Sequence, residues 1–285
     1  MQDERKRRES EPRAIAAARN GRGGKLFSAA CAALLAAIVL IAIVLFGTGC
    51  AAKKERVIIH SIEGETTSQL PAGGTRTVAD VVEDVADTVV EIKCKVVTYV
   101  NTPWGQLRQE GTSSGSGVIL DANGYIITNH HVIESATDIS VRLHNGADYE
   151  TCDAVLIASD ADNDIAVIKV EKEGLSFATF GDSSALKAGQ PVVVIGNPLG
   201  TLGGTVTDGI LSALGREITI DGTTMTLLQT NAAINQGNSG GGMFDLDGRL
   251  IGIVNAKSSG TGIEGLGFAI PANTAKEVYE RLLAA

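Results

Sequence analysis

The chain has 285 residues, of which 44% are hydrophobic, 20% are charged and only 4% are aromatic, and its formal net charge is −9. The hydrophobic share excludes a low-complexity disordered chain, and the acidic balance excludes a protein whose main partner is nucleic acid. The charge is also unevenly divided. Residues 1–25 carry eight basic and four acidic residues, whereas residues 51–285 carry 16 basic and 29 acidic ones. This asymmetry predicts a membrane between the two parts.

Residues 26–46 form a run of 21 residues without a charge. A helix of this length spans about 31 Å, close to the hydrocarbon thickness of a bilayer. The excess of Lys and Arg before the run predicts a single-pass membrane protein with residues 1–25 in the cytoplasm and residues 47–285 outside. A cleaved signal peptide is the less favoured alternative, because secretory apolar regions usually have 7–15 residues. Lipid attachment at Cys50 also stays open.

The four cysteines do not form a metal or redox motif. Cys31 and Cys50 lie in the predicted span and at its outer end, while Cys94 and Cys152 belong to the exported part, where disulfides can persist. No C-x-x-C pair occurs, so a zinc ribbon or a thioredoxin-type site has no support. Cys94 is on the apolar face of a predicted strand, which favours a buried free thiol over a Cys94–Cys152 disulfide.

The exported part reads as a β protein. Residues 47–76 show little periodicity and are interpreted as a juxtamembrane linker, after which Thr77 and Asp80 predict the start of a short helix. Asn-Gly and Asp-Gly turn signals then separate strand-like runs, without βαβ alternation. These runs are 90–96, 117–120, 125–128, 139–143, 154–158, 165–170, 192–195, 224–228 and 250–255. The pattern predicts an antiparallel all-β fold of one or two barrels, with a break near residues 171–190 and a final helix over 275–283.

Ser239 is the candidate nucleophile. It lies in the run Gly237-Asn238-Ser239-Gly240-Gly241, which can expose a hydroxyl and aim backbone N–H groups at an oxyanion. Alone, this pattern equally fits a structural turn or the Gly-x-Ser-x-Gly elbow of α/β-hydrolases. The elbow requires a His after the Ser, and all four histidines (His60, His130, His131 and His144) precede Ser239. A catalytic Ser239 would therefore use the order His, Asp, Ser.

A catalytic Ser239 would need a His as base and an Asp as acid, and the sequence offers one candidate region for each. His130 and His131 follow a strand-like run, and adjacent side chains point in different directions, so at most one of them is expected to reach Ser239. Asp164 directly precedes an apolar strand-like run, where a partly buried carboxylate could orient an imidazole.

The region around Asp164 must also be weighed as a calcium loop. Asp160, Asp162 and Asp164 have the spacing of such a loop, with Glu171 at its twelfth position, but Ile165 stands where the loop needs Gly. We therefore expect no metal site, and we interpret Asp160 and Asp162 as solvated loop residues.

Seven motifs, in order, resemble the protease domain of the HtrA/DegP family of trypsin-like serine proteases of the bacterial cell envelope. They are Gly115-Ser116-Gly117, Thr128-Asn129-His130-His131-Val132, Asn163-Asp164-Ile165-Ala166-Val167, Ile195-Gly196-Asn197-Pro198, Thr205-Val206-Thr207, Gln229-Thr230-Asn231-Ala232-Ala233-Ile234-Asn235 and Gly237-Asn238-Ser239-Gly240-Gly241. The resemblance implies two antiparallel six-stranded β-barrels, over about 77–172 and 173–285.

The resemblance also implies functional residues. The His before Val in the second motif would be the base, which is His131, with Asp164 as the acid and Ser239 as the nucleophile. The oxyanion donors would come from Gly237, Asn238 and Ser239. The positions of the substrate pocket would be Ala233, Ile234, Asn255, Ala256 and Lys257. With no acid at its base, this pocket is expected to take small and medium aliphatic side chains.

Two departures from the family pattern are visible. Asn231 stands where many members have Asp, and only 14 residues follow Pro271, too few for the C-terminal PDZ domains that members often carry. The resemblance implies unfolded or exported proteins as substrates, no cofactor, and a possible homotrimer. A dedicated signalling protease with one membrane-protein substrate stays an alternative, as does a catalytically silent binding scaffold.

Overall fold

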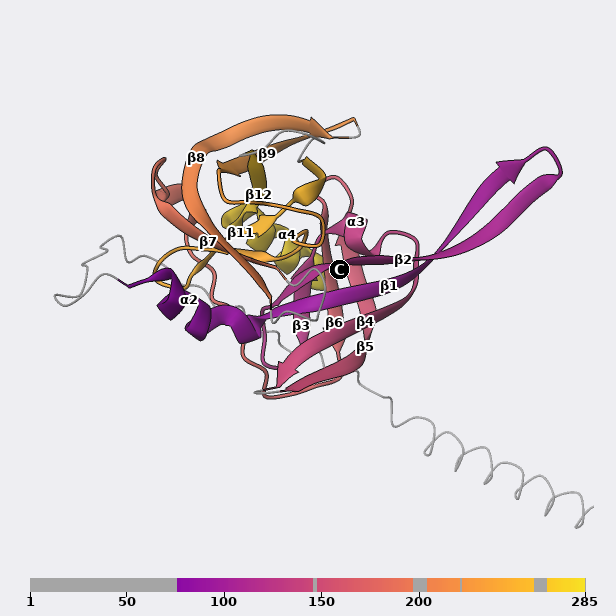
Figure 1. The fold of residues 1–285 in the computed structure, drawn as a ribbon, viewed down its shortest axis with the longest axis horizontal. Coiled ribbons are helices and arrows are strands. Elements are labelled where there is room, and N and C mark those ends of the chain that lie inside the picture. Colours follow the sequence, from indigo (N-terminus) through magenta and orange to yellow (C-terminus); the bar gives the residue numbers. More distant parts are fainter. Residues whose placement is uncertain (1–75, 146–147, 197–203, 221, 259–265, 285) are drawn as a thin grey trace, which may run out of the picture. The chain divides into compact units, whose positions relative to one another are not determined.

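The structure is a computed structural model that describes residues 76–145, 148–196, 204–220, 222–258 and 266–284 (Figure 1). The predicted membrane span at 26–46 lies outside these ranges, as do Cys31, Cys50 and His60. Within them, no helix has both the length and the apolar character needed to cross a bilayer.

Helix α2 (Val78–Val85) opens the described chain and begins where the sequence predicts a helix. The Thr77 hydroxyl accepts the Asp80 N–H at 3.3 Å, and the Asp80 carboxylate accepts the Thr77 N–H at 2.7 Å. This reciprocal pair satisfies two donors that a helix start would otherwise leave unbonded. Val81 and Val85 are buried, and the short 3₁₀ turn η1 (Ala86–Thr88) leads into the first strand.

The first sheet closes into a six-stranded antiparallel barrel, because β4 pairs back onto β1. Along β1, Val90, Ile92 and Cys94 point into the barrel, as the two-residue period of a strand requires. The strands are β1 (Val89–Thr102), β2 (Gly105–Ile119), β3 (Tyr125–Thr128), β4 (Ala136–Asn145), β5 (Asp148–Asp160) and β6 (Ile165–Val170). They follow the order β1-β2-β3-β6-β5-β4 around the barrel.

The second sheet repeats this order as β7-β8-β9-β12-β11-β10 and also closes. Its strands are β7 (Pro191–Gly196), β8 (Thr205–Ile220), β9 (Thr223–Thr230), β10 (Gly242–Phe244), β11 (Leu250–Val254) and β12 (Gly267–Pro271). The all-β prediction is confirmed. Three strands were not predicted from the sequence: β8, whose alternation is broken by Gly209 and Gly215, and the short strands β10 and β12.

Residues 171–190 connect the two barrels and include the 3₁₀ turn η2 (Ser183–Ala185). The final helix, α4 (Ala272–Ala284), lies against β5 and β6 of the first barrel and against β11 and β12 of the second. Its Tyr279 is fully buried in a core cluster to which both barrels contribute. Helix α4 therefore packs across the junction of the two barrels.

An ion pair joins α4 to the first barrel. Arg281 bonds the carboxylate of Asp160 at the end of β5, and Asn163 donates to the same carboxylate. The Asp160 side chain is only 10% exposed, so the expectation of a solvated Asp160 is wrong; Asp162 is exposed, as expected. The error arose because the helix that supplies Arg281 is more than 100 residues further along the chain.

Both described cysteines are free thiols. Cys94 is buried inside the first barrel, and this burial raises the pKa of its thiol to about 11. Cys152 on β5 is partly buried, and the pKa of its thiol is also raised, by burial and by the neighbouring Glu150. Neither thiol is poised to react at neutral pH.

Strands β1 and β2 continue past the barrel as a projecting two-stranded ribbon (Figure 1). The last pair between β1 and β4 is at Val96, and β2 pairs with β3 only at Val118 and Ile119. From Val97↔Glu110 to Thr102↔Gly105, the two strands therefore pair only with each other. We call residues 97–110 the ribbon.

Candidate active site

His131, Asp164 and Ser239 meet at the junction of the two barrels. His131 lies in the short helix α3 (His130–Ile133) after β3, Asp164 in the turn between β5 and β6, and Ser239 in the loop before β10. The His131 Nδ1 atom is 2.7 Å from Asp164 Oδ2, and the His131 Nε2 atom is 3.0 Å from Ser239 Oγ. The three side chains thus form a continuous hydrogen-bonded chain, as the sequence predicts.

The Asp164 carboxylate is fixed by its neighbours. Its Oδ1 accepts the backbone N–H of His131 at 3.0 Å, and its Oδ2 accepts the Asn255 side-chain amide at 2.9 Å as well as bonding the imidazole. Asn129 donates to the Asp164 carbonyl at 3.0 Å. Asp164 also has a φ of +50°, a conformation that Asp tolerates better than most residues and that is enriched at functional sites. The carboxylate can therefore orient the His131 ring, and stabilise a positive charge on it, without moving.

The loop that carries Ser239 is anchored to the opposite barrel. The Ser116 N–H donates to the Ser239 carbonyl at 2.8 Å, and the Ser116 hydroxyl donates to the Gly237 carbonyl at 2.7 Å. Gly240 has a φ of +82°, and a Cβ at this position would collide with the Ser116 carbonyl and the Thr128 hydroxyl. A glycine is therefore required where the two barrels approach each other.

The expected oxyanion donors do not behave alike. Within the described part of the chain, the N–H groups of Gly237 and Ser239 form no backbone hydrogen bond. The N–H of Asn238, in contrast, donates to the Asn235 carbonyl at 3.1 Å. The prediction that Asn238 is an oxyanion donor is therefore wrong, because its N–H already forms the hydrogen bond that closes this turn.

The five expected pocket residues separate into different environments. Ala233 is exposed, whereas Ile234 is only 9% exposed and packs beside Gly267 in the core of the second barrel. Ala256 is partly buried and its N–H donates to Ser239 Oγ at 3.2 Å, while Lys257 is exposed.

Asn255 corrects the sequence prediction. It was expected to line the substrate pocket, but it is 1% exposed and its amide bonds the Asp164 carboxylate. The contact joins residues 91 positions apart, and an Asn after a buried strand gives no sequence signal for it. Ser116 and Asn129 were likewise missed as supports, although both lie within motifs that the sequence analysis singled out.

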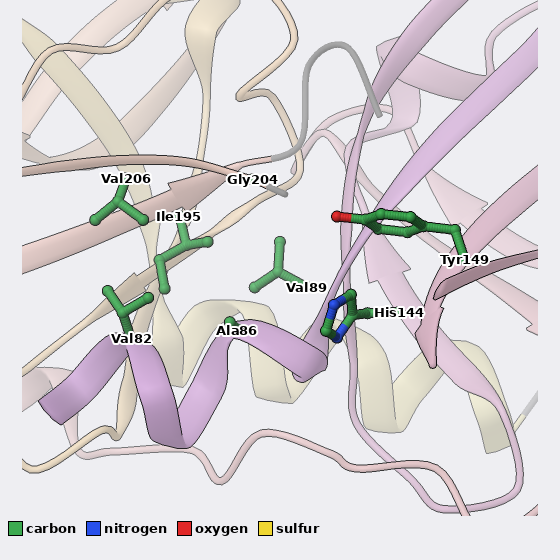
Figure 2. A pocket seen from close by; sticks show the side chains of 8 residues that line it. All are labelled: Val82, Ala86, Val89, His144, Tyr149, Ile195, Gly204 and Val206. Atoms are coloured by element: carbon green, nitrogen blue, oxygen red, sulfur yellow. The ribbon is translucent and has the colours of Figure 1, made fainter. Parts of the chain in front are cut away.

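The other described histidines do not join this chain of hydrogen bonds. The His130 Nδ1 atom is buried and has no hydrogen-bond partner among the described residues. His144 pairs with Asp87 and lies edge-on to Tyr149. With Tyr149, His144 lines a separate pocket, whose other lining residues come from α2, η1, β1, β7, β8 and Gly204 just before β8 (Figure 2). The geometry thus selects His131 from the adjacent pair.

Comparisons with known proteins agree with this arrangement. The family model described as trypsin-like peptidase domain matches residues 115–253. The chain is 41% identical over 234 residues to "Serine protease Do-like HtrB" of Bacillus subtilis, a match that covers 78% of this chain and 50% of the relative. It is 50% identical over 173 residues to "Probable periplasmic serine endoprotease DegP-like" of Rickettsia conorii, covering 59% of this chain and 33% of that protein. The chain therefore spans half or less of these curated relatives.

A solved structure gives the corresponding match in three dimensions. The "HtrA-type protease AlgW with decapeptide" superposes with a TM-score of 0.63 at 36% identity, over 73% of this chain and 68% of that chain. The fold, the ordered motifs and the sequence identity lead to one conclusion: this chain belongs to the HtrA/DegP family of trypsin-like serine proteases.

Proposed function

We propose that this chain is a serine endopeptidase of the cell envelope that cleaves misfolded or regulatory exported proteins through Ser239, His131 and Asp164. The observation that carries the proposal is the position of the His131 ring, which bonds Asp164 through one nitrogen and Ser239 through the other. The relatives named as periplasmic endoproteases support an extracytoplasmic site of action.

The reaction follows from the order of these contacts. His131 Nε2 takes the proton of the Ser239 hydroxyl while Ser239 Oγ attacks the peptide carbonyl. Asp164 keeps the other ring nitrogen protonated and stabilises the imidazolium that forms. His131 then protonates the leaving amine, and a water molecule, deprotonated by His131 in turn, releases the acyl group from Ser239.

The N–H groups of Gly237 and Ser239 stabilise the tetrahedral intermediate. They belong to the loop that Ser116 holds, and they form no competing backbone bond in the described chain. One such donor is worth about 3–4 kcal/mol in transition-state stabilisation. The donors need not reorganise when charge develops on the substrate oxygen, because the loop is already anchored.

Substrate choice is set by an apolar, shallow pocket. Ala233, Ile234 and Ala256 offer no acidic group that would select Lys or Arg, so small and medium aliphatic residues before the scissile bond are favoured. One methylene changes the preference by only about 1–3 kcal/mol, which makes the selectivity broad.

The proposal includes a membrane anchor. Residues 26–46 would form the single transmembrane helix, with residues 1–25 in the cytoplasm and the barrels outside. Retention of the full chain in the membrane fraction after alkaline wash, together with activity of a C-terminal reporter outside the cytoplasm, would support the anchor. A soluble mature form that starts near Cys50 would contradict it.

Cleavage of casein by the full chain tests the activity itself. We expect Ser239→Ala to abolish cleavage while the far-UV circular dichroism stays unchanged. A library of peptides should reveal a preference for Val, Ala, Ile or Leu before the cut. Cleavage that persists in Ser239→Ala would contradict the proposed nucleophile, and a preference for Arg, Lys or large aromatics would contradict the proposed pocket.

A further inference from the structure

The tip of the ribbon exposes large apolar side chains that the catalytic machinery does not use. Trp104 is 93% exposed, Tyr99 63%, Leu107 61% and Val100 44%. Among the described residues, the ribbon pairs with no other strand, and these side chains remain exposed. A two-stranded ribbon that exposes this much apolar surface to water is unfavourable, which indicates that something else covers it.

The charge of the tip differs from that of the whole domain. Residues 97–107, which we call the tip, contain no charged side chain, in a chain where 20% of residues are charged. The first charges after the tip, Arg108 and Glu110, neutralise each other in an ion pair at 2.9 Å. An interaction of the tip must therefore depend on apolar contact and not on charge.

The tip ends in a tight turn. Pro103 and Trp104 form this turn between the paired residues Thr102 and Gly105, so Trp104 follows the last residue pair of the ribbon. Ligand-binding sites are usually concave, whereas the tip is the end of a projecting hairpin (Figure 1). The eleven residues of the tip are also fewer than the 20–30 residues per side that a stable protein–protein interface uses.

We propose that the ribbon tip inserts its apolar side chains into the outer interfacial layer of the membrane that anchors the chain. Trp and Tyr favour this layer because their rings are apolar while their N–H and O–H groups remain hydrated. This inference rests on the anchor in the proposed function. Only 30 residues, 47–76, separate the predicted span from the barrels, so this covalent tether limits how far the barrels can lie from the bilayer.

Membrane contact would give the domain a second attachment point. The ribbon contains six residue pairs and is therefore about 20 Å long. Nearer the barrel on β2, the Ser113 hydroxyl donates to the carbonyl of Val132, the residue directly after His131. A tip in the bilayer would thus hold the active site a short distance above the membrane surface, where the exposed ends of membrane-bound substrates lie.

Trp104 is the only tryptophan of the chain, so its fluorescence reports on the tip alone. The full chain carrying Ser239→Ala, which prevents self-digestion, would be reconstituted into phosphatidylcholine vesicles. We expect a blue-shifted emission, strong quenching by lipids brominated on their acyl chains and weak quenching by aqueous acrylamide. These properties should not change with salt, because the tip has no charge.

Matched variants separate the tip from the rest of the apolar surface. Val100→Ser with Leu107→Ser should return the Trp104 emission toward that of a water-exposed indole. Val155→Ser with Ile157→Ser, which removes exposed apolar residues from β5, should leave the emission blue-shifted. In the catalytically active chain, neither pair should change hydrolysis of a short soluble peptide, since both lie outside the site.

Three results would overturn the proposal. One is a Trp104 that remains accessible to acrylamide in the vesicles. Another is a blue shift that appears without lipid and grows with protein concentration, which would assign the tip to a second copy of the chain. The third is a blue shift that appears only when an unfolded polypeptide is added. Alkaline extraction of the same vesicles tests the anchor separately, so failure of the tip and failure of the anchor are distinguishable.

Discussion

The two ends of strand β2 have opposite characters. At one end, Ser116 is fully buried, and its N–H and hydroxyl hold the loop that carries Ser239. At the other end, Leu107 is 61% exposed and its strand pairs only with β1. Burial and cross-barrel bonding make the first end rigid enough to position a reaction, whereas the second end is free to contact a surface. The same strand therefore joins a preorganised site to an exposed apolar tip.

Changing Asp164, the proposed acid, should give the largest effect at the rigid end. Asp164→Asn replaces a carboxylate that fixes the tautomer of His131 with an amide that can favour the wrong one. By analogy with the equivalent change in a known triad, we expect kcat to fall by about 10⁴-fold. Steady-state hydrolysis of a peptide would measure this fall. A loss of less than tenfold would show that Asp164 does not orient the base.

Core and ribbon substitutions should differ in their effect on stability. Ile92→Ala removes a fully buried side chain from the first barrel and should lower the free energy of unfolding by about 2–5 kcal/mol. Leu107→Ala at the ribbon tip should change it by no more than about 0.5 kcal/mol. Chemical denaturation followed by circular dichroism measures both. Equal costs would mean that the tip packs against the protein in solution.

Asn255 is a positioning residue at the rigid end, which we expect to act on the reaction through Asp164. Asn255→Ala removes a hydrogen bond to a charged group, worth about 1.5–3 kcal/mol, so we expect kcat to fall roughly 10- to 100-fold with little change in KM. Asn255→Ser would supply a hydroxyl donor and should recover part of the loss. If KM rose instead while kcat was unchanged, Asn255 would belong to the substrate pocket.

The smallest effect concerns the pair that links α4 to the first barrel. Burial alone would raise the pKa of Asp160, but hydrogen bonds from Arg281 and Asn163 outweigh it, so the pKa lies below its ordinary value. An acid whose pKa is lowered by folding stabilises the folded state above its unfolded pKa, and this contribution is lost as the pH falls through the folded-state pKa.

The substitution Asp160→Asn tests this predicted pH dependence of the stability. Because Arg281 is largely exposed, the substitution should cost at most about 1 kcal/mol at pH 7. The difference between the variant and the original chain should shrink as the pH falls below the ordinary pKa of Asp. Denaturation curves at a series of pH values would measure it, and a difference that grows on acidification would contradict the assignment.

The sequence predicted those parts of the molecule whose structure depends on neighbouring residues in the chain. The alternation around Val90 and Ile92, the cap at Thr77 and the Gly-rich run around Ser239 each specify their own structure within a few residues. The order of His and Ser excluded a competing site, and the position of Asp164 before an apolar run indicated the buried acid. The choice of His131 over His130 as the proposed base, however, came from the family resemblance.

Contacts between distant segments could not be predicted in this way. Asn255 reaches Asp164 across the junction of the barrels, and Arg281 reaches Asp160 from the last helix. The projecting ribbon was also not predicted, because apolar and polar residues do not alternate regularly over 97–110 and only the pairing of β1 with β2 shows its form. In each case the residues are visible in the sequence, but which residues contact each other depends on the folding of distant segments onto one another.

Labelling of Ser239 by a fluorophosphonate tests the central claim most directly, because this probe reacts only with an activated serine. Mass spectrometry of the full chain should find one adduct, on Ser239. The adduct should be lost in His131→Ala and kept in the matched variant His130→Ala. An unlabelled Ser239 in a folded protein, or an adduct that depends on His130 and not on His131, would contradict the proposed active site.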